Sequence, residues 1–239
     1  MISTLQQLVG LGERISSTPS KTVNFNANLP VNVSVIKKLD NTRYRLKIGR
    51  KELTTRSQKS LQEGTLYWGN FSQDKDGILM LSDLCAQPLL FQKQEYFLES
   101  DMEDIFSSQT FSINSFKKAL LEKLTAPEVD KPTFRLLSFI LLGLSKGVLH
   151  LSFFKENKRS IIQIRPFNDE YELYMALENL GPIKGVLTQK GLTLNLLYAK
   201  SLYFLEKEVS KLDMIVTLGL SKEIAPLYDA NELSFDIKG

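Results

Sequence analysis

Between residues 31 and 84, short runs of alternating apolar and polar residues limit the fold more than any other feature of the sequence. Apolar side chains occupy every second position in the runs 31–35 and 44–48. Because successive side chains of a strand point to opposite faces of a sheet, this period of two predicts half-buried β-strands. Five short strands joined by tight turns predict a small N-terminal β-barrel, SH3-like or OB-like. The three further strands are expected over 51–56, 65–71 and 78–84.

The spacing of apolar residues changes to a helical one after residue 87. The segment 113–124 has apolar residues three and four positions apart, and either Ser112 or Asn114 is suited to cap its N-terminus. Pro132 suits the first turn of a second helix, because its missing N–H has no partner to lose there. The region 87–147 is therefore expected to be a helical connector.

The last ninety or so residues return to alternation and include one amphipathic helix. The helix is predicted over 199–212, with apolar residues on one side and charged residues on the other. Strands are expected over 148–155, 160–166, 171–178, 184–189, 192–198, 214–220 and 233–237. This order predicts a helix packed on one face of a mostly antiparallel sheet.

The complete pattern predicts an α+β protein, and its length suits one large or two ordinary domains. A short amphipathic helix is expected over 2–16, before a linker rich in Ser, Thr, Pro and Asn. The expected parts are an N-terminal helix and linker (1–30), a small β-barrel (31–86), a helical connector (87–147) and a C-terminal α+β domain (148–239).

Cysteine usage and hydropathy bear on the compartment. Cys85 is the single cysteine, so an intramolecular disulfide is excluded, which suits a reducing environment. No stretch approaches the roughly 18 apolar residues that a membrane-spanning helix needs. The N-terminus also lacks the basic region and cleavage site of a signal peptide. The sequence therefore predicts a cytoplasmic protein without membrane insertion.

The polar residues do not assemble into a recognisable active site. His150 is the single histidine, and no nucleophile or carboxylate partner is identifiable from its spacing. One histidine and one cysteine are too few for an ordinary zinc site, and no Gly-Lys-Ser/Thr phosphate loop is present. The acidic run 99–104 lacks the ligand spacing of a calcium loop. We therefore expect a non-enzymatic protein with no catalytic residues, no metal and no cofactor.

Positive charge is concentrated near the N-terminus. The first sixty residues hold eleven Lys and Arg against three Asp and Glu, a balance of +8. Alternation places Arg43, Arg45 and Lys47 on one face of a strand, and Lys37 and Lys38 flank it. Three interpretations remain open: a solvated face, a surface for an acidic protein, or a surface that tracks a nucleic-acid backbone.

The segment 171–187 contains Leu180-Gly181-Pro182-Ile183 within a run of alternating apolar residues. A strand, an alanine-led helix and another strand are expected after it. This order, with the Leu-Gly pair at its start, resembles the C-terminal domain of flagellar hook-length control proteins (the FliK family). The stretch 33–68 is also similar to part of some members. The long Pro/Gln/Ser-rich region linked to length sensing in that family is missing, so the resemblance does not extend to that activity.

The resemblance implies a non-enzymatic factor that contacts the flagellar type III export apparatus or hook components. In that family the C-terminal domain contacts the export-gate switch protein. Carried over to this sequence, it implies a partner-binding segment that includes Leu180, Gly181, Lys184 and Val186. It also leaves open whether the N-terminal helix is an export signal or a docking peptide, and whether the protein stays in the cytoplasm or is exported. The alternative function is nucleic-acid binding by the basic face.

Overall fold

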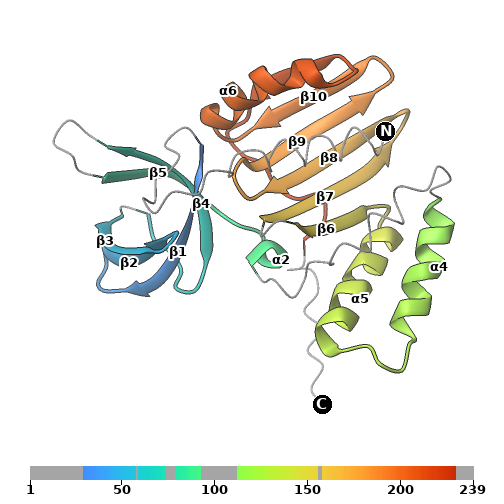
Figure 1. Ribbon diagram of the computed structural model, residues 1–239, viewed down its shortest axis with the longest axis horizontal. Coiled ribbons are helices and arrows are strands. Elements are labelled where there is room, and N and C mark those ends of the chain that lie inside the picture. The colour runs from blue at the N-terminus through green and yellow to red at the C-terminus, as the bar shows by residue number, and fades with distance from the viewer. Residues whose placement is uncertain (1–28, 58, 74–78, 93–111, 156–157, 230–239) are drawn as a thin grey trace.

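The computed structural model describes residues 29–57, 59–73, 79–92, 112–155 and 158–229. These form an α+β fold of two mostly antiparallel sheets with few helices, which confirms the predicted class (Figure 1). The strands before residue 87 form the smaller sheet, and those after residue 148 form the larger one beside it. The expected helix at 2–16, the acidic run at 99–104 and the expected strand at 233–237 lie outside the described residues.

The first sheet has five strands in the order β3-β2-β1-β4-β5, and every neighbouring pair is antiparallel. The predicted alternation is confirmed in β2, where Tyr44, Leu46 and Ile48 are buried and the residues between them are exposed. The strands are β1 (Val31–Lys38), β2 (Arg43–Ile48), β3 (Lys51–Arg56), β4 (Leu66–Gln73) and β5 (Leu79–Ala86).

The predicted closed barrel is not seen, because β3 and β5 are the two edges of an open sheet in the described part of the chain. Closure would require these strands to pair with each other. Instead, the register of β4 and β5 shifts, and Asp83 within the shift has a left-handed φ of 53°. The carbonyl of Asp83 accepts a 3.0 Å hydrogen bond from Tyr198 Oη. The larger part of the protein therefore holds the strand that barrel closure would need.

A small apolar core covers one face of the first sheet. Tyr44 Oη accepts the backbone N–H of Leu61 at 3.3 Å, which ties the loop before β4 to β2. The opposite face carries basic residues on β2 and Trp68 on β4, so it is charged at one end and apolar at the other. The fully buried members of the small core are Val33, Val35, Tyr44, Leu46, Ile48 and Leu61.

The second sheet has six strands in the order β11-β10-β9-β8-β7-β6. Its neighbours are antiparallel except β10 and β11, which run parallel because a helix crosses between them. The sequence placed the start of β9 three residues too late. The strands are β6 (Leu149–Lys155), β7 (Lys158–Phe167), β8 (Glu170–Leu177), β9 (Gly181–Thr188), β10 (Gly191–Leu196) and β11 (Val216–Leu220).

Helices cover one face of the second sheet (Figure 1). Helix α5 (Lys131–Ser145) packs on β6 with α4 (Ile113–Leu124) against it, and α6 (Ala199–Glu208) packs on β10 and β11. Ser112 is confirmed as the cap of α4, since its side chain accepts the N–H of Ser115 at 3.1 Å. The helices expected as a connector thus share the largest apolar core with the sheet. No helix in the described residues is long and apolar enough to span a membrane.

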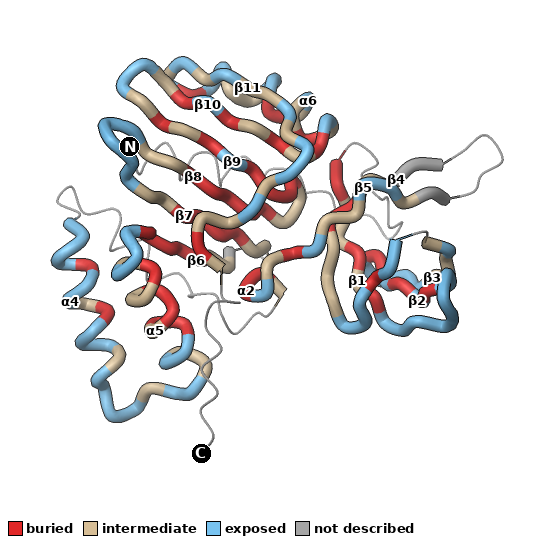
Figure 2. Tube along the Cα trace, turned by 180° about the vertical axis from the view of Figure 1, so that it is seen from behind, coloured by how far each residue is buried: buried red, intermediate tan, exposed pale blue. Residues whose placement is uncertain are grey.

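A second apolar core covers part of the opposite face. It brings together Trp68 of β4, Phe91 of the short helix α2 (Leu89–Gln92) and Tyr174 of β8. Phe139 of α5 and Tyr228 stack on each other in the same core, with ring centroids 4.5 Å apart. Figure 2, a view from behind, shows buried residues along the middle strands of the sheet. The second sheet is therefore buried on both faces over part of its area.

Candidate functional site

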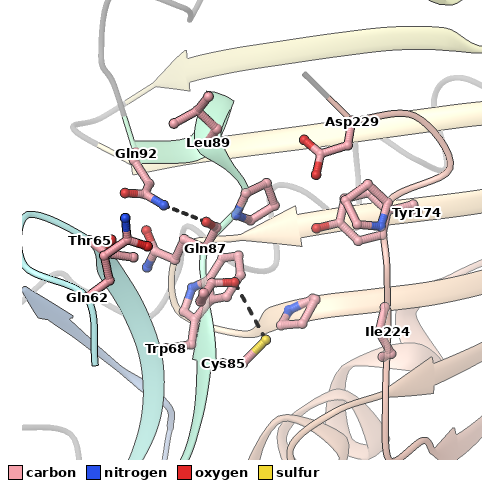
Figure 3. A pocket seen from close by; sticks show the side chains of 14 residues that line it. Gln62, Thr65, Trp68, Cys85, Gln87, Leu89, Gln92, Tyr174, Ile224 and Asp229 are labelled. Atoms are coloured by element: carbon pink, nitrogen blue, oxygen red, sulfur yellow. Dashed lines mark hydrogen bonds between the residues drawn. The ribbon is translucent and has the colours of Figure 1, made fainter. Parts of the chain in front are cut away.

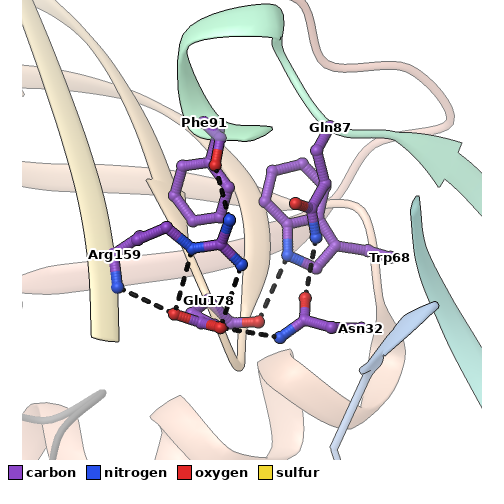
Figure 4. A network of polar contacts seen from close by, with 6 residues as sticks. All are labelled: Asn32, Trp68, Gln87, Phe91, Arg159 and Glu178. Atoms are coloured by element: carbon purple, nitrogen blue, oxygen red, sulfur yellow. Dashed lines mark hydrogen bonds and ion pairs between the residues drawn. The ribbon is translucent and has the colours of Figure 1, made fainter. Parts of the chain in front are cut away.

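A partly buried ion pair lies where the two sheets meet (Figure 4). Arg159 of β7 places Nη2 3.1 Å from Glu178 Oε1, and the two side chains are only 15% and 18% exposed. The backbone N–H of Arg159 also donates to Glu178 Oε2 at 2.8 Å. From the first sheet, Asn32 Nδ2 donates to Glu178 Oε1 at 3.2 Å. Because charge-assisted bonds are strong and directional, this carboxylate fixes one sheet against the other.

Trp68 supplies the apolar part of the same junction. Its indole Nε1 donates to the backbone carbonyl of Glu178 at 3.2 Å, and its ring lies 5.1 Å from that of Phe91. The Arg159 guanidinium sits over the other ring of this pair, 5.1 Å from the Phe91 centroid. Gln87 Nε2 completes the network with a 2.7 Å bond to Asn32 Oδ1. The junction is therefore both apolar and hydrogen-bonded.

A cavity of about 400 Å³ opens beside this network (Figure 3). Its size lies within the roughly 300–1,000 Å³ that ligand pockets usually have. Both sheets and the segment after β11 contribute to its walls. Its apolar lining includes Trp68, Pro182, Ile224 and Pro226, and its polar lining includes Gln62, Thr65, Gln87 and Asp229.

Two polar groups in this lining, the Gln87 amide and the Cys85 thiol, bear on whether the cavity binds a ligand or reacts with it. Gln87 is 2% exposed, and its Oε1 is buried without a hydrogen-bond donor. Cys85 also lines the cavity, and burial raises the pKa of its thiol. A thiol that stays protonated is a poor nucleophile, so the geometry favours binding over covalent chemistry at this place.

His150 lies away from the cavity, on β6. Burial lowers the pKa of its imidazole to about 3, so the ring is neutral at physiological pH. Its Nδ1 lies 3.1 Å from Gln163 Nε2, and its ring meets Phe139 edge to face at 4.8 Å. The structure thus places His150 in a core, without access to a substrate. No group of three or more His, Cys, Asp or Glu residues placed to hold a metal ion occurs in the part of the chain that the structure describes.

The basic residues of the first sheet form a basic stripe of Lys37, Arg43, Arg45, Lys47 and Arg56. In register, Lys37 opposes Arg45 and Arg43 opposes Arg56, so basic side chains from three strands are neighbours on one exposed face. Lys38 does not join them: the register shift in β1 sets it opposite the inward-pointing Tyr44, although it is exposed. The structure therefore brings together four of the five residues expected here and adds Arg56.

Asp40 partly neutralises one end of the stripe. It forms an ion pair with Arg43, whose Nε lies 2.5 Å from Asp40 Oδ2. The N–H of Thr42 and the Arg43 guanidinium hold the pKa of Asp40 well below its usual range. The carboxylate is therefore charged at any physiological pH. Because Glu52 lies opposite Lys47 in register, Lys37, Arg45 and Arg56 form the main cationic surface.

The four residues implied by the resemblance divide into two pairs. Leu180 is fully buried, and its carbonyl accepts a 2.8 Å bond from Ser201 Oγ. Gly181 is also buried and has a φ of +77°, and a Cβ there would lie 2.7 Å from the Tyr198 ring. Neither side chain reaches the surface. Leu180 and Gly181 instead shape the turn that starts β9, and a leucine-glycine pair suits that turn because only glycine fits the site.

Lys184 and Val186 point to the opposite face from the helices. They alternate along β9 with Ile183 and Leu187, which belong to the helix-covered core. Lys184 is exposed and Val186 is half-buried. On the β10 side they adjoin Asn195 and Thr193 in register, and on the β8 side they adjoin Tyr174, which belongs to the second core, and Glu172. The part of this face that the second core leaves uncovered is the open face, made of Lys184, Val186, Thr193, Asn195 and Thr217.

Sequence reasoning missed the junction residues. The sequence singled out none of Trp68, Gln87 and Arg159 for this role, and Glu178 was expected only as the end of a strand. One signal was available: in the alternation of β4, Trp68 falls on the face opposite Tyr67. Because a tryptophan side chain carries a large apolar area and one N–H donor, its position on this face favours a contact with another element.

None of the protein-family models, curated proteins or solved structures that were compared with this chain gave a match.

Proposed function

We propose that this chain is a non-enzymatic protein-interaction factor of flagellar type III export or hook assembly. In this role it contacts export-apparatus or hook components from the cytoplasm, or on its own way out through that apparatus. One observation carries the proposal: of the four residues that the resemblance implies, the two with outward side chains lie two positions apart on an exposed sheet face.

The open face suits a protein partner. It is built on a rigid sheet whose other side is filled by the largest core, so its side chains are held in fixed positions. Its groups are mixed, with one cation, one aliphatic residue and several hydroxyl and amide groups. A surface of this kind offers hydrogen bonds and moderate apolar area, as transient interfaces do. The order β10, α6, β11 after the Leu-Gly turn also supports the resemblance.

The direct test is a binding titration between the purified chain and the cytosolic domain of an export-gate switch protein. The variant carrying Lys184→Glu and Val186→Asp is expected to weaken binding by about tenfold or more, because both side chains would be central contacts. The matched control is Lys190→Glu, an exposed lysine in the turn after β9, which is expected to leave the affinity unchanged.

Two results would remove the proposal. One is the absence of binding between the wild-type chain and this domain. The other is a flagellated bacterium that carries the gene and keeps normal motility and hook length after its deletion. Equal weakening by the control variant would place the contact outside the open face.

The basic stripe favours a second candidate, which is an anionic partner at the first sheet. Five exposed cationic residues lie on three neighbouring strands. Among the described residues, two carboxylates lie close to them: Asp40, which pairs with Arg43, and Glu52, which is opposite Lys47 in register. An acidic protein suits this surface better than single-stranded nucleic acid, because Tyr44 points inward and Trp68 is buried against the second sheet. The test is a salt titration of binding to oligonucleotides and to polyglutamate, with Arg45→Glu as the variant.

A further inference from the structure

We propose that the cavity between the two sheets is a binding site for an uncharged, extended peptide segment with one apolar side chain. The site goes beyond the function proposed above, because it lies at the junction of the sheets and uses none of the residues of the open face. Three features carry the proposal: an unpartnered buried acceptor, a lining of mixed polarity, and a near absence of charge.

The acceptor is Oε1 of Gln87. The side chain is 2% exposed and is held in place, since its Nε2 donates to Asn32 Oδ1 at 2.7 Å. Its Oε1 is buried and receives no hydrogen bond. A buried acceptor without a donor carries a free-energy cost, because it has lost its bond to water and gained none. Gln87 lines the cavity, so a ligand N–H that reaches Oε1 through a local shift of the lining would remove that cost, and a peptide backbone supplies one.

The rest of the lining suits a peptide group beside an apolar side chain. Thr65 offers a hydroxyl and Gln62 an amide, which together can donate to a carbonyl and accept from an N–H. Opposite them, Pro182, Ile224 and Pro226 provide an apolar wall. Sites that alternate hydrogen-bonding groups with a side-chain pocket are those that read extended chains.

The charges of the lining disfavour nucleotides and other phosphorylated ligands, which are the main alternative class. Among the described residues, the lining contains no Lys, Arg or His, and its one carboxylic acid is Asp229. A nucleotide or other phosphorylated ligand would bring negative charge to a cavity with no cation to pair with it, which is unfavourable in a partly desolvated site. An uncharged ligand meets no such penalty. The geometry therefore favours a neutral peptide.

The cavity carries two unique reporters. Trp68 is the single tryptophan of the chain and Cys85 its single cysteine, and both line the cavity. The emission of Trp68 and the alkylation rate of Cys85 therefore report on this place alone. No fusion or added label is needed, so the full chain can be used as it is.

The probe is N-acetyl-leucine methylamide, which has one apolar side chain and two backbone N–H groups. It is expected to shift Trp68 emission saturably and to slow the alkylation of Cys85 several-fold, with a dissociation constant in the millimolar range, as suits so small a ligand. The matched control probe is the same molecule with both amide nitrogens methylated, which removes the donors. It is expected to have no effect on either reporter.

Two variants locate the contact. Gln87→Met removes the acceptor and is expected to weaken the probe about threefold to tenfold. It also removes the bond to Asn32, so Asn32→Ala serves as its control: that variant loses the same bond but keeps Gln87 Oε1, and is expected to bind within about twofold of the wild type. Ile224→Phe, at a half-buried wall position, is expected to block the probe without disturbing the fold.

Several outcomes would overturn the proposal. A probe that changes neither reporter would show that the cavity does not bind this peptide group. Equal effects of the methylated probe show that the acceptor plays no part. Protection of Cys85 by adenosine monophosphate, but not by the capped leucine, would assign the cavity to a nucleotide instead.

Discussion

The two sheets differ in how their faces are buried. The first sheet has one small core on one face, and its other face is charged over β2 and β3. The second sheet has a large core under its helices and a second core on its opposite face. Part of that second core is Trp68, which comes from the first sheet. The larger sheet is therefore the scaffold, and the smaller one completes its own packing by docking on it.

The largest effect is expected from Trp68→Ala, which breaks the docking of the two sheets. The side chain is fully buried, and its loss removes apolar contact and the bond to the Glu178 carbonyl. The free energy of unfolding is expected to fall by about 3–5 kcal/mol, measured by urea denaturation followed by circular dichroism. Alkylation of Cys85, which pairs with Trp68 across the β4–β5 ladder, is expected to become faster.

Tyr67→Ala is the matched comparison, because Tyr67 is the preceding residue and packs into the core of the first sheet alone. It should lower stability while leaving the alkylation of Cys85 unchanged. A loss below about 1 kcal/mol for Trp68→Ala would mean that the sheets are independent.

The next effect in size comes from Gly181→Ala, compared with Gly64→Ala. Both glycines have left-handed φ values, +77° and +74°. A Cβ at Gly64 meets nothing within 4 Å, whereas one at Gly181 meets the Tyr198 ring at 2.7 Å. Thermal and urea unfolding should show a loss of about 1–2 kcal/mol for Gly64→Ala and about 2–4 kcal/mol for Gly181→Ala. Equal losses would contradict the close packing inferred at the start of β9.

A smaller effect is expected in the pH dependence of stability, which differs between the two sheets because the single histidine of the chain lies in the second sheet. Burial lowers the folded-state pKa of His150 from 6.5 to about 3. Below pH 6.5 the His150 imidazole therefore binds a proton in the unfolded chain but stays neutral in the folded chain. The free energy of unfolding then falls as the pH decreases towards 3. The slope from this group is about 1.4 kcal/mol per pH unit.

His150→Gln removes this titration while keeping a hydrogen-bonding group next to Gln163. The difference in unfolding free energy between the wild type and the variant, followed from pH 7 to 4.5, should therefore change with pH in favour of the variant. Parallel curves would show that the imidazole is protonated in the folded state.

The smallest effect is expected from Arg45→Glu in the basic stripe. The side chain is exposed, so the free energy of unfolding should change by no more than about 0.5 kcal/mol. Binding to polyglutamate should weaken, and its dependence on salt should become less steep. A large loss of stability would show that the charged face of the first sheet is part of its packing and not a free surface.

Local pattern predicted most of the elements. The bounds of β2, β3 and α4 agree with the predicted segments, because alternation, helical spacing and the Ser112 cap act over a few neighbouring residues. The short helix α2 was missed, since four residues carry too little periodicity. The barrel prediction was wrong because strand closure depends on which distant elements compete for an edge.

The sequence predicted the candidate sites only in part, as it did the fold. The stripe of Arg43, Arg45 and Lys47 was found from alternation alone, and the structure keeps it together. Leu180 and Gly181 were expected at a binding surface, yet the structure buries both. Alternation shows that residues share a face, but it cannot show which face another element will cover.

The sequence by itself determined where strands and helices run, which face of β2 is charged, and that the single cysteine forms no internal disulfide. Only the tertiary structure decided that the first sheet stays open, that Trp68 packs against the second sheet and not in the small core of the first, and that a cavity forms at the junction. The physical reason is distance along the chain. Trp68 and the carbonyl that it binds are 110 residues apart, and Asn32 and Glu178 are 146 apart. Such contacts follow from the packing of whole sheets, which no local pattern encodes.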